Sequence, residues 1–168
     1  VQFATIGDFT TQDQYSEELQ ATGKLGEFNY VAGLYYFKEL IDADARTISG
    51  TAQATGLVTL TDGRNIYNLP STSKAAYGNV GWKPAALDER LELSAGIRYT
   101  KDRKHLNARR IQNGALQGPQ VTSDSWSNVG YSFSASYQWL PDVMTYARYA
   151  SSFRAGGYNP AQIGAPSY

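Results

Sequence analysis

Several segments of this chain alternate between apolar and polar residues, and this alternation limits the possible folds more than any other feature. From Leu91 to Thr100, every odd-numbered residue is apolar and every even-numbered residue is polar, charged or glycine. The same rule holds from Val129 to Trp139. A period of two places all the apolar side chains on one face of a β-strand. The chain is therefore predicted to form strands with one apolar and one polar face.

Related patterns divide the chain into a series of expected strands. We place them at residues 17–25, 28–38, 75–83, 91–100, 126–139 and 143–153. In residues 28–38 both faces are apolar, so the sequence leaves the orientation of that strand open. The prolines support this division, because proline cannot donate a hydrogen bond to a neighbouring strand. All of them lie outside these segments: Pro70, Pro84, Pro119, Pro141, Pro160 and Pro166.

The expected connections alternate between short and long. Residues 26–27, 84–90 and 140–142 form short turns, whereas the polar residues 38–74 and 101–125 are expected to form long loops. Short turns on one side and long loops on the other are typical of an outer-membrane barrel. A strand of about ten residues at ~3.3 Å each, tilted by ~45°, rises roughly 23 Å, close to the ~25 Å apolar band of such barrels. We therefore predict an all-β fold, an antiparallel up-and-down meander of about six long strands that pair in sequence order.

Aromatic residues agree with a membrane position. The chain has Tyr 13, Phe 6 and Trp 3, although its mean hydropathy is only −0.44. Trp82 and Trp139 precede short turns, and Tyr36, Tyr99 and Phe153 lie near the opposite strand ends, so both rims would carry amphipathic rings. A soluble antiparallel sandwich or barrel also has alternating strands. It explains neither the asymmetry of the connections nor the strand length, since ordinary strands average ~5–6 residues.

Composition argues against catalysis and against resident cofactors. The chain contains Lys+Arg 15, Asp+Glu 15, Cys 0 and a single histidine, His105. Zinc sites, iron–sulfur clusters, disulfides and histidine-activated nucleophiles are therefore disfavoured. Adjacent carboxylates such as Glu17 and Glu18 would point to opposite faces of a strand and could not act as an acid/base couple. No apolar stretch is long enough for a transmembrane helix. We expect no enzyme, no cofactor and no metal site.

Three blocks of sequence resemble one known family. SEELQ at residues 16–20, followed by YVAGLYYF at residues 30–37, is similar to an internal hairpin of TonB-dependent outer-membrane receptors. LSAGIRYTKD at residues 93–102 and YARYASSFRAGGYN at residues 146–159 resemble two further strands of that family. The order and spacing of the three blocks strengthen the resemblance, which extends over nearly the whole chain.

The resemblance implies a fold and a function. Barrels of this family have about twenty-two strands around an N-terminal plug, so residues 1–168 would be a partial receptor barrel, with neither a plug domain nor a signal peptide. The implied function is active import of a scarce nutrient, such as an iron–siderophore complex, energised through TonB. The implied partners are the TonB complex, bound through a missing N-terminal region, a ferric siderophore, outer-membrane lipid and lipopolysaccharide. The implied location is the bacterial outer membrane.

A basic segment at residues 101–110 is the first candidate site. It is expected to be an extracellular loop, and its candidate ligand-binding residues are Arg103, Lys104, His105, Arg109 and Arg110. Clustered positive charge would raise the local concentration of an anionic ligand. The alternative is a loop that is merely solvated or that rests on lipopolysaccharide phosphates. Nucleic acid is disfavoured, because no basic face or base-stacking module accompanies the cluster.

Charged residues on the polar faces form a second candidate site. Glu92, Arg98, Arg148 and Arg154 are expected to face the lumen of the barrel. An arginine on the lipid face would cost ~2–4 kcal/mol at mid-bilayer. The arginines would contact a plug, line a ligand route, or be ordinary groups solvated by lumen water. Three acidic residues lack the pattern of a calcium-binding loop and are expected to be solvated carboxylates in turns. They are Asp42, Asp44 and Asp62.

Two other functional classes remain open at this point. One is a passive porin-type channel or structural outer-membrane barrel, and the other is a soluble secreted β-domain with a binding role. The ligand itself cannot be read from the sequence. An apolar outer face and two unpaired edge strands predict that the excerpt is unstable alone.

Overall fold

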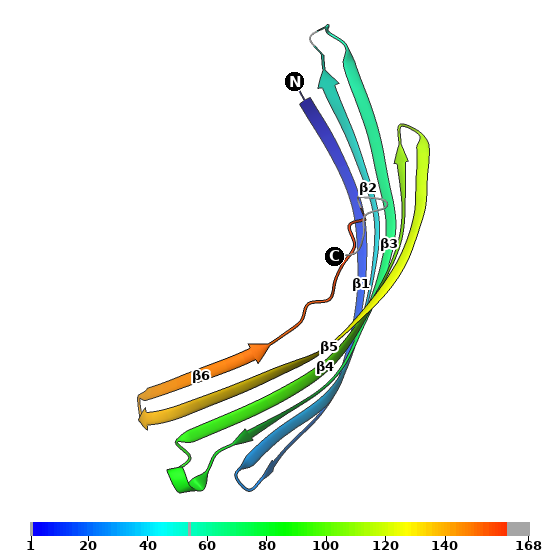
Figure 1. The fold of residues 1–168 in the computed structure, drawn as a ribbon. Coiled ribbons are helices and arrows are strands. Elements are labelled where there is room, and N and C mark those ends of the chain that lie inside the picture. The colour runs from blue at the N-terminus through cyan, green and yellow to red at the C-terminus, as the bar shows by residue number, and fades with distance from the viewer. Residues whose placement is uncertain (1, 54, 161–168) are drawn as a thin grey trace.

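The computed structural model describes residues 2–53 and 55–160, whose strands form one antiparallel sheet. Its strand order, β1-β2-β3-β4-β5-β6, follows the sequence (Figure 1). The elements are β1 (Gln2–Leu25), β2 (Phe28–Ala52), β3 (Val58–Trp82), the 3-10 helix η1 (Ala85–Leu87), β4 (Leu91–Gln112), β5 (Ala115–Leu140) and β6 (Val143–Ser151). The predicted all-β meander is confirmed. No helix in the described part of the chain is long and apolar enough to cross a membrane.

The two expected long loops are instead continuations of strands. Residues 38–52 extend β2 and residues 58–74 extend β3. The connection between β2 and β3 is therefore only residues 53–57. Residues 101–112 extend β4, and the connection to β5 is Asn113–Gly114, with φ values of 48° and 82°. This dipeptide suits the tight hairpin turn, which requires positive φ at both positions. The prediction of two long loops was wrong, because strands pair through backbone hydrogen bonds and can do so without an apolar face.

Two prolines lie inside strands, contrary to expectation. Pro70 belongs to β3, at a point where the β3–β4 ladder is interrupted between Asn68 and Ser71. Pro119 belongs to β5, beside the register shift opposite residues 108–110 of β4. Bulges and interruptions leave a backbone nitrogen without a ladder partner, and proline is tolerated there.

The register places each residue on one of two faces. Directly opposed residues share a face, and Leu34 of β2 lies opposite both Leu19 and Ala76. Near the short turns, this side of the sheet is the apolar face. Gly33 lies opposite both Gln20 and Tyr77, on the polar face. The orientation of residues 28–38, which the sequence left open, is thereby determined.

The apolar face has no covering layer among the described residues. Leu19 is 72% exposed and Phe133 is 53% exposed, although both are large apolar residues. Apolar side chains in water are unfavourable, so a contiguous face of this kind marks a contact with another apolar medium. The sheet therefore has the surface that a lipid-facing wall requires.

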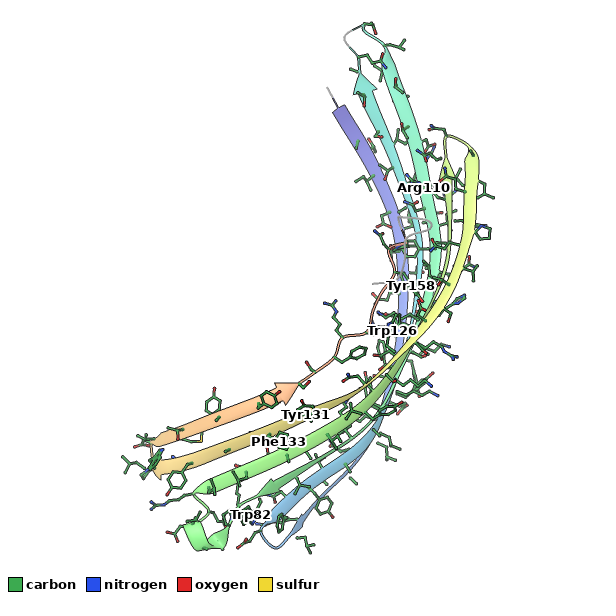
Figure 2. All side chains as sticks on the ribbon, in the orientation of Figure 1. Trp82, Arg110, Trp126, Tyr131, Phe133 and Tyr158 are labelled. Atoms are coloured by element: carbon green, nitrogen blue, oxygen red, sulfur yellow. The ribbon has the colours of Figure 1, made fainter. Side chains whose placement is uncertain are left out.

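A small core forms on the other face, far from the short turns. The C-terminal segment, residues 152–160, leaves β6 and runs along the concave side of the sheet (Figure 1). Its Tyr158 packs against Leu106 and Ala108 of β4, beside Trp126 of β5 (Figure 2). These β4 residues have the parity of Arg98, so the polar face is the concave one.

Polar contacts hold the C-terminal segment in place. The Tyr158 hydroxyl lies 3.0 Å from a carboxylate oxygen of Asp124 and 3.2 Å from the carbonyl oxygen of Lys104. The Lys104 ammonium donates to the carbonyl oxygen of Gly156 at 2.8 Å. Burial and the Asp124 carboxylate raise the pKa of the Tyr158 hydroxyl. The segment is thus fastened to β4 and β5 rather than lying free.

Candidate functional site

A tyrosine on the polar face reaches across three strands. Tyr77 of β3 lies opposite Gly33 of β2, and a Cβ atom at Gly33 would come within 2.5 Å of the Tyr77 ring. The missing side chain lets the ring lie across β2. There its hydroxyl donates to Glu18 at 2.5 Å and accepts from the Gln20 amide at 2.9 Å. A glycine in β2 therefore allows β3 to bond directly to β1.

Arg98 of β4 completes this cluster. Its guanidinium carbon lies 5.4 Å from the ring centroid of Tyr35 and 5.6 Å from that of Tyr77, within the range of cation–π attraction. Its Nε donates to the Thr100 hydroxyl at 3.2 Å. Within residues 2–53 and 55–160, no carboxylate forms an ion pair with Arg98. The guanidinium is held in place by neutral groups and keeps N–H donors for an anion.

A hollow of about 490 Å³ lies next to Arg98. Arg148 of β6 also lines it, together with Ser132 of β5. Gly96, on the floor of the hollow, makes room for the Asn79 side chain, because a Cβ atom there would lie 2.7 Å from the Asn79 amide nitrogen. Two cationic groups in a concave polar site favour the binding of an anionic group.

The structure separates the other two expected lumen residues from this hollow. Glu92 lies near the short turns, where the Lys83 ammonium is 3.3 Å from its carboxylate. Arg154 belongs to the C-terminal segment, beyond the end of β6 at Ser151, and does not line the hollow. Arg98 and Arg148 are therefore the pair that the fold brings together.

The basic segment is not an extracellular loop, and its residues do not form one cluster. Residues 101–110 belong to β4, where β3 and β5 pair with it on both sides. Arg103 and His105 take the apolar-face parity, whereas Lys104 takes the polar-face parity. Arg109 has the parity of the apolar face and lies beside Asp44. The half-buried Arg110 has the parity of the polar face (Figure 2). A strand necessarily sends neighbouring side chains to opposite sides.

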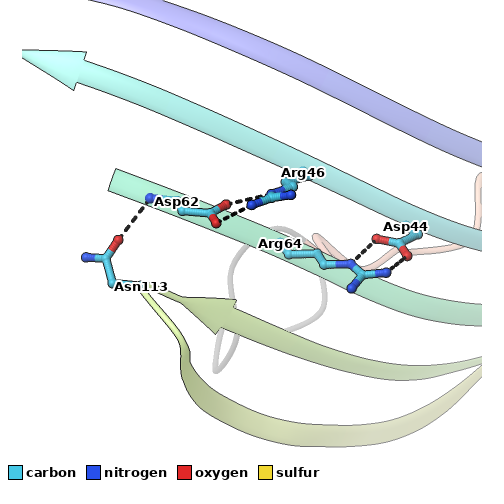
Figure 3. A network of polar contacts seen from close by, with 5 residues as sticks. All are labelled: Asp44, Arg46, Asp62, Arg64 and Asn113. Atoms are coloured by element: carbon cyan, nitrogen blue, oxygen red, sulfur yellow. Dashed lines mark hydrogen bonds and ion pairs between the residues drawn. The ribbon is translucent and has the colours of Figure 1, made fainter. Parts of the chain in front are cut away.

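Ion pairs occupy the end of the β2–β3 hairpin that is far from the short turns. Arg46 donates to both carboxylate oxygens of Asp62, at 2.9 and 2.6 Å (Figure 3). Arg64 likewise makes a two-pronged contact with Asp44, with Nε at 2.7 Å. These arginines hold the pKa of each carboxyl below its ordinary range, chiefly by hydrogen bonding. Asp62 is also linked to the next hairpin, because its backbone N–H donates to Asn113 at 2.9 Å.

These pairs settle the role of the acidic residues. Asp42 accepts a hydrogen bond from the Asn68 amide at 2.7 Å, so all three expected solvated carboxylates have protein partners. The pairs share the face that is apolar nearer the short turns, and they are exposed to solvent. This face is therefore apolar near the short turns and charged at its far end. The sequence does not reveal these pairs, because their polar surroundings predict a loop and a loop has no cross-strand register.

Comparison with known families decides what this sheet is. The profile of the family described as "TonB dependent receptor-like, beta-barrel" matches residues 2–167. The chain belongs to this family. Receptors of this family are outer-membrane transporters and not enzymes, in agreement with the absence of a catalytic arrangement expected from the sequence. The sequence resemblance to TonB-dependent receptors is confirmed.

A solved structure supports the fold of this receptor barrel segment. The chain is similar to the ferric yersiniabactin uptake receptor FyuA from Yersinia pestis, with a TM-score of 0.75 and 20% sequence identity. The match covers 98% of this chain and 25% of FyuA, so the chain spans about a quarter of that receptor's length. A pneumolysin membrane pore complex aligns with a TM-score of only 0.16 and 9% identity, which carries no argument. No curated protein sequence matches the chain.

Proposed function

We propose that this segment forms part of the wall of an outer-membrane receptor that imports a scarce nutrient, such as an iron–siderophore complex, with energy supplied through TonB. The observation that carries this proposal is the hollow that contains Arg98 and Arg148, on the concave face of a sheet whose opposite face is apolar. FyuA, a ferric yersiniabactin uptake receptor by name, offers a precedent for such a wall.

The proposal assigns each face a surrounding medium. The apolar face contacts lipid, because it carries exposed residues such as Ile97 and Phe133 on neighbouring strands. The polar face lines the lumen and carries Glu92, Arg98 and Arg148, with Arg154 following in the C-terminal segment. The opposite orientation would place arginines in the bilayer at a cost of ~2–4 kcal/mol each at mid-depth.

The chemistry of the hollow suggests a class of ligand. Two guanidinium groups can donate paired hydrogen bonds to carboxylate, phenolate or similar oxygen anions, which are common on metal chelates. Because neutral rings and a hydroxyl position Arg98, its charge is not already compensated. The ligand is therefore expected to be an anionic chelate, with the iron as cargo held by the chelator.

Partners follow from the same proposal. The TonB complex would contact a part of the receptor outside residues 1–168, and outer-membrane lipid and lipopolysaccharide would surround the apolar face. A passive porin-type channel and a soluble binding domain fit less well, since the chain belongs to a family of active receptors. A soluble domain would also leave the apolar face in water.

Ligand binding to the full receptor tests the proposal. Replacing both Arg98 and Arg148 by Gln should weaken the binding of anionic ferric siderophores by roughly tenfold or more, as expected for lost charge-assisted hydrogen bonds. A control variant, in which Lys24 and Arg90 become Gln, removes the same charge near the short turns and outside the hollow. Equal affinity in the arginine variant and the native receptor, across a panel of carboxylate and phenolate siderophores, would overturn the assignment of this hollow.

A further inference from the structure

On the apolar face, a row of apolar residues is followed directly by a row that contains two lysines. One row of directly opposed residues is apolar across four strands, and it consists of Leu19, Leu34, Ala76 and Tyr99. In the next row, farther from the short turns, Lys74 of β3 lies directly opposite Lys101 of β4. The apolar band of the wall therefore ends at a pair of lysines.

Neither lysine of this pair forms an ion pair within the described chain. Like charges directly opposed on a sheet destabilise it. Lys74 lies 5.8 Å over the ring of Tyr36, a contact that leaves its charge in place, and both lysines are exposed. An external anion that bridges the two ammonium groups would turn this repulsion into attraction.

Two more cations extend the positive charge. Lys38 and Arg103 lie one row beyond, on the same face, on either side of Thr72. We call Lys38, Lys74, Lys101 and Arg103 the basic patch. One carboxylate, Glu17, lies opposite Tyr36 in the row of Lys74 and also lines the adjoining groove. It accepts the Tyr15 hydroxyl at 2.6 Å and forms no ion pair with either lysine, so the four cations outnumber it.

A groove joins the basic patch to the apolar band. It has a volume of about 690 Å³, and Leu19, Leu34, Ala76 and Tyr99 line it together with both lysines of the pair. An apolar groove that ends at two ammonium groups matches a molecule with a hydrocarbon chain and an anionic head. Cations at the edge of a membrane-embedded surface attract lipid headgroups in this way.

We propose that the groove and the basic patch bind lipid A, the phosphorylated glycolipid anchor of lipopolysaccharide. An acyl chain lies along the apolar row, and a phosphate bridges Lys74 and Lys101, with Lys38 and Arg103 beside it. The phosphate supplies a counter-charge and accepts charge-assisted hydrogen bonds from both ammonium groups. This inference rests on the proposed outer-membrane placement of the sheet and assigns a site to that partner.

Lipid binding to the full receptor in neutral detergent provides the first test. The probes are bisphosphorylated lipid A, the same lipid without its phosphates, and phosphatidylglycerol. K74Q/K101Q should bind lipid A roughly tenfold or more weakly than the native receptor. K24Q/R90Q, which removes the same charge near the short turns, should bind it as the native receptor does. Equal binding of the phosphate-free lipid or of phosphatidylglycerol would overturn the assignment to lipid A.

A second test compares the unfolding temperatures of K101E and the native receptor, whose order should reverse when lipid A is added. In neutral detergent, K101E should unfold at a higher temperature than the native receptor, because it replaces a repulsive cross-strand pair by an attractive one. With lipid A present, the order should invert, since the native receptor gains the bound phosphate and the variant repels it. A variant that stays more stable in both conditions would contradict lipid A binding at this pair.

A spin label at Val80 in vesicles separates this proposal from the membrane placement. Val80 lies on the apolar face and outside the groove. If the label is in lipid while K74Q/K101Q retains full lipid A binding, the lipid A site is wrong and the placement holds. If the label is in water, the placement itself fails, and the inference fails with it.

Discussion

The ring of Tyr77 lies over Gly33 of the neighbouring strand, where any Cβ atom would come within 2.5 Å of it. Tyr77 is one of two rings beside Arg98, and its hydroxyl bonds to Glu18 of β1. A single missing side chain therefore positions both the inter-strand hydrogen bond and the cation of the candidate ligand hollow. Substitution at Gly33 should affect both stability and ligand binding.

Gly33→Ala in the full receptor should displace the Tyr77 ring and lower the free energy of unfolding by about 1 kcal/mol, the lower end for inserting a methyl group into a filled space. Gly7→Ala is the matched control, because a Cβ atom there meets nothing within 4 Å. Urea unfolding in detergent measures both. Equal losses of unfolding free energy in the two variants would show that the contact between Tyr77 and Gly33 does not contribute specifically to stability.

Tyr158 should determine whether the C-terminal segment stays against the sheet. Tyr158→Phe removes the hydroxyl near Asp124 and should cost about 1 kcal/mol, whereas Tyr158→Ala also empties a buried site and should cost about 3 kcal/mol. Hydrogen exchange of residues 152–160 measures the opening of the segment. Unchanged protection in Tyr158→Ala would mean that other contacts hold it.

The far end of the β2–β3 hairpin should loosen in acid. Hydrogen bonds from Arg64 and Arg46 lower the pKa of Asp44 and Asp62 below the ordinary value of 3.8. A lowered pKa in the folded state adds stability above the unfolded-state value, and this stability is lost as the pH falls through the folded-state pKa. The protection of amides near residue 62, relative to their intrinsic exchange rate at each pH, should therefore fall below about pH 4.

Arg46→Gln removes one of these pairs and supplies the control for the acid experiment. In this variant the acid-dependent loss of protection near residue 62 should shrink, because Asp62 no longer receives the Arg46 hydrogen bonds that lower its pKa. The same acid response in the variant and the native receptor would assign the effect to other groups.

Spin labels at positions 93 and 94 test the two faces directly. Leu93 shares the face of Phe133 through its partner Ala135, whereas Ser94 bonds to the Ser134 hydroxyl at 2.7 Å on the polar face. In the full receptor in vesicles, the label at 93 should be accessible to lipid-soluble oxygen and the label at 94 to a water-soluble reagent. Similar accessibilities at the two positions would contradict the assignment of the faces.

The sequence alone determined the part of the fold that meets an apolar medium. Leu91, Ile97 and Phe133 alternate with polar residues because only one face of those strands avoids water, and this alternation is visible without a structure. The meander order, the short turns and the inward side of Arg98 and Arg148 followed from it. The strand extensions could not be found in this way, because their residues do not alternate regularly between apolar and polar.

Tertiary structure decided the features that depend on register. Residues 28–38 are apolar on both sides, and only their pairing with β1 and β3 shows which side is which. The basic segment at 101–110 divides between two faces, and Lys74 meets Lys101, because an antiparallel ladder aligns residues far apart in sequence. Tyr158 reaches Leu106 through packing that no local pattern encodes. Local polarity specifies which face a side chain prefers, whereas the partner across the strand is set by the backbone hydrogen bonds of the whole sheet.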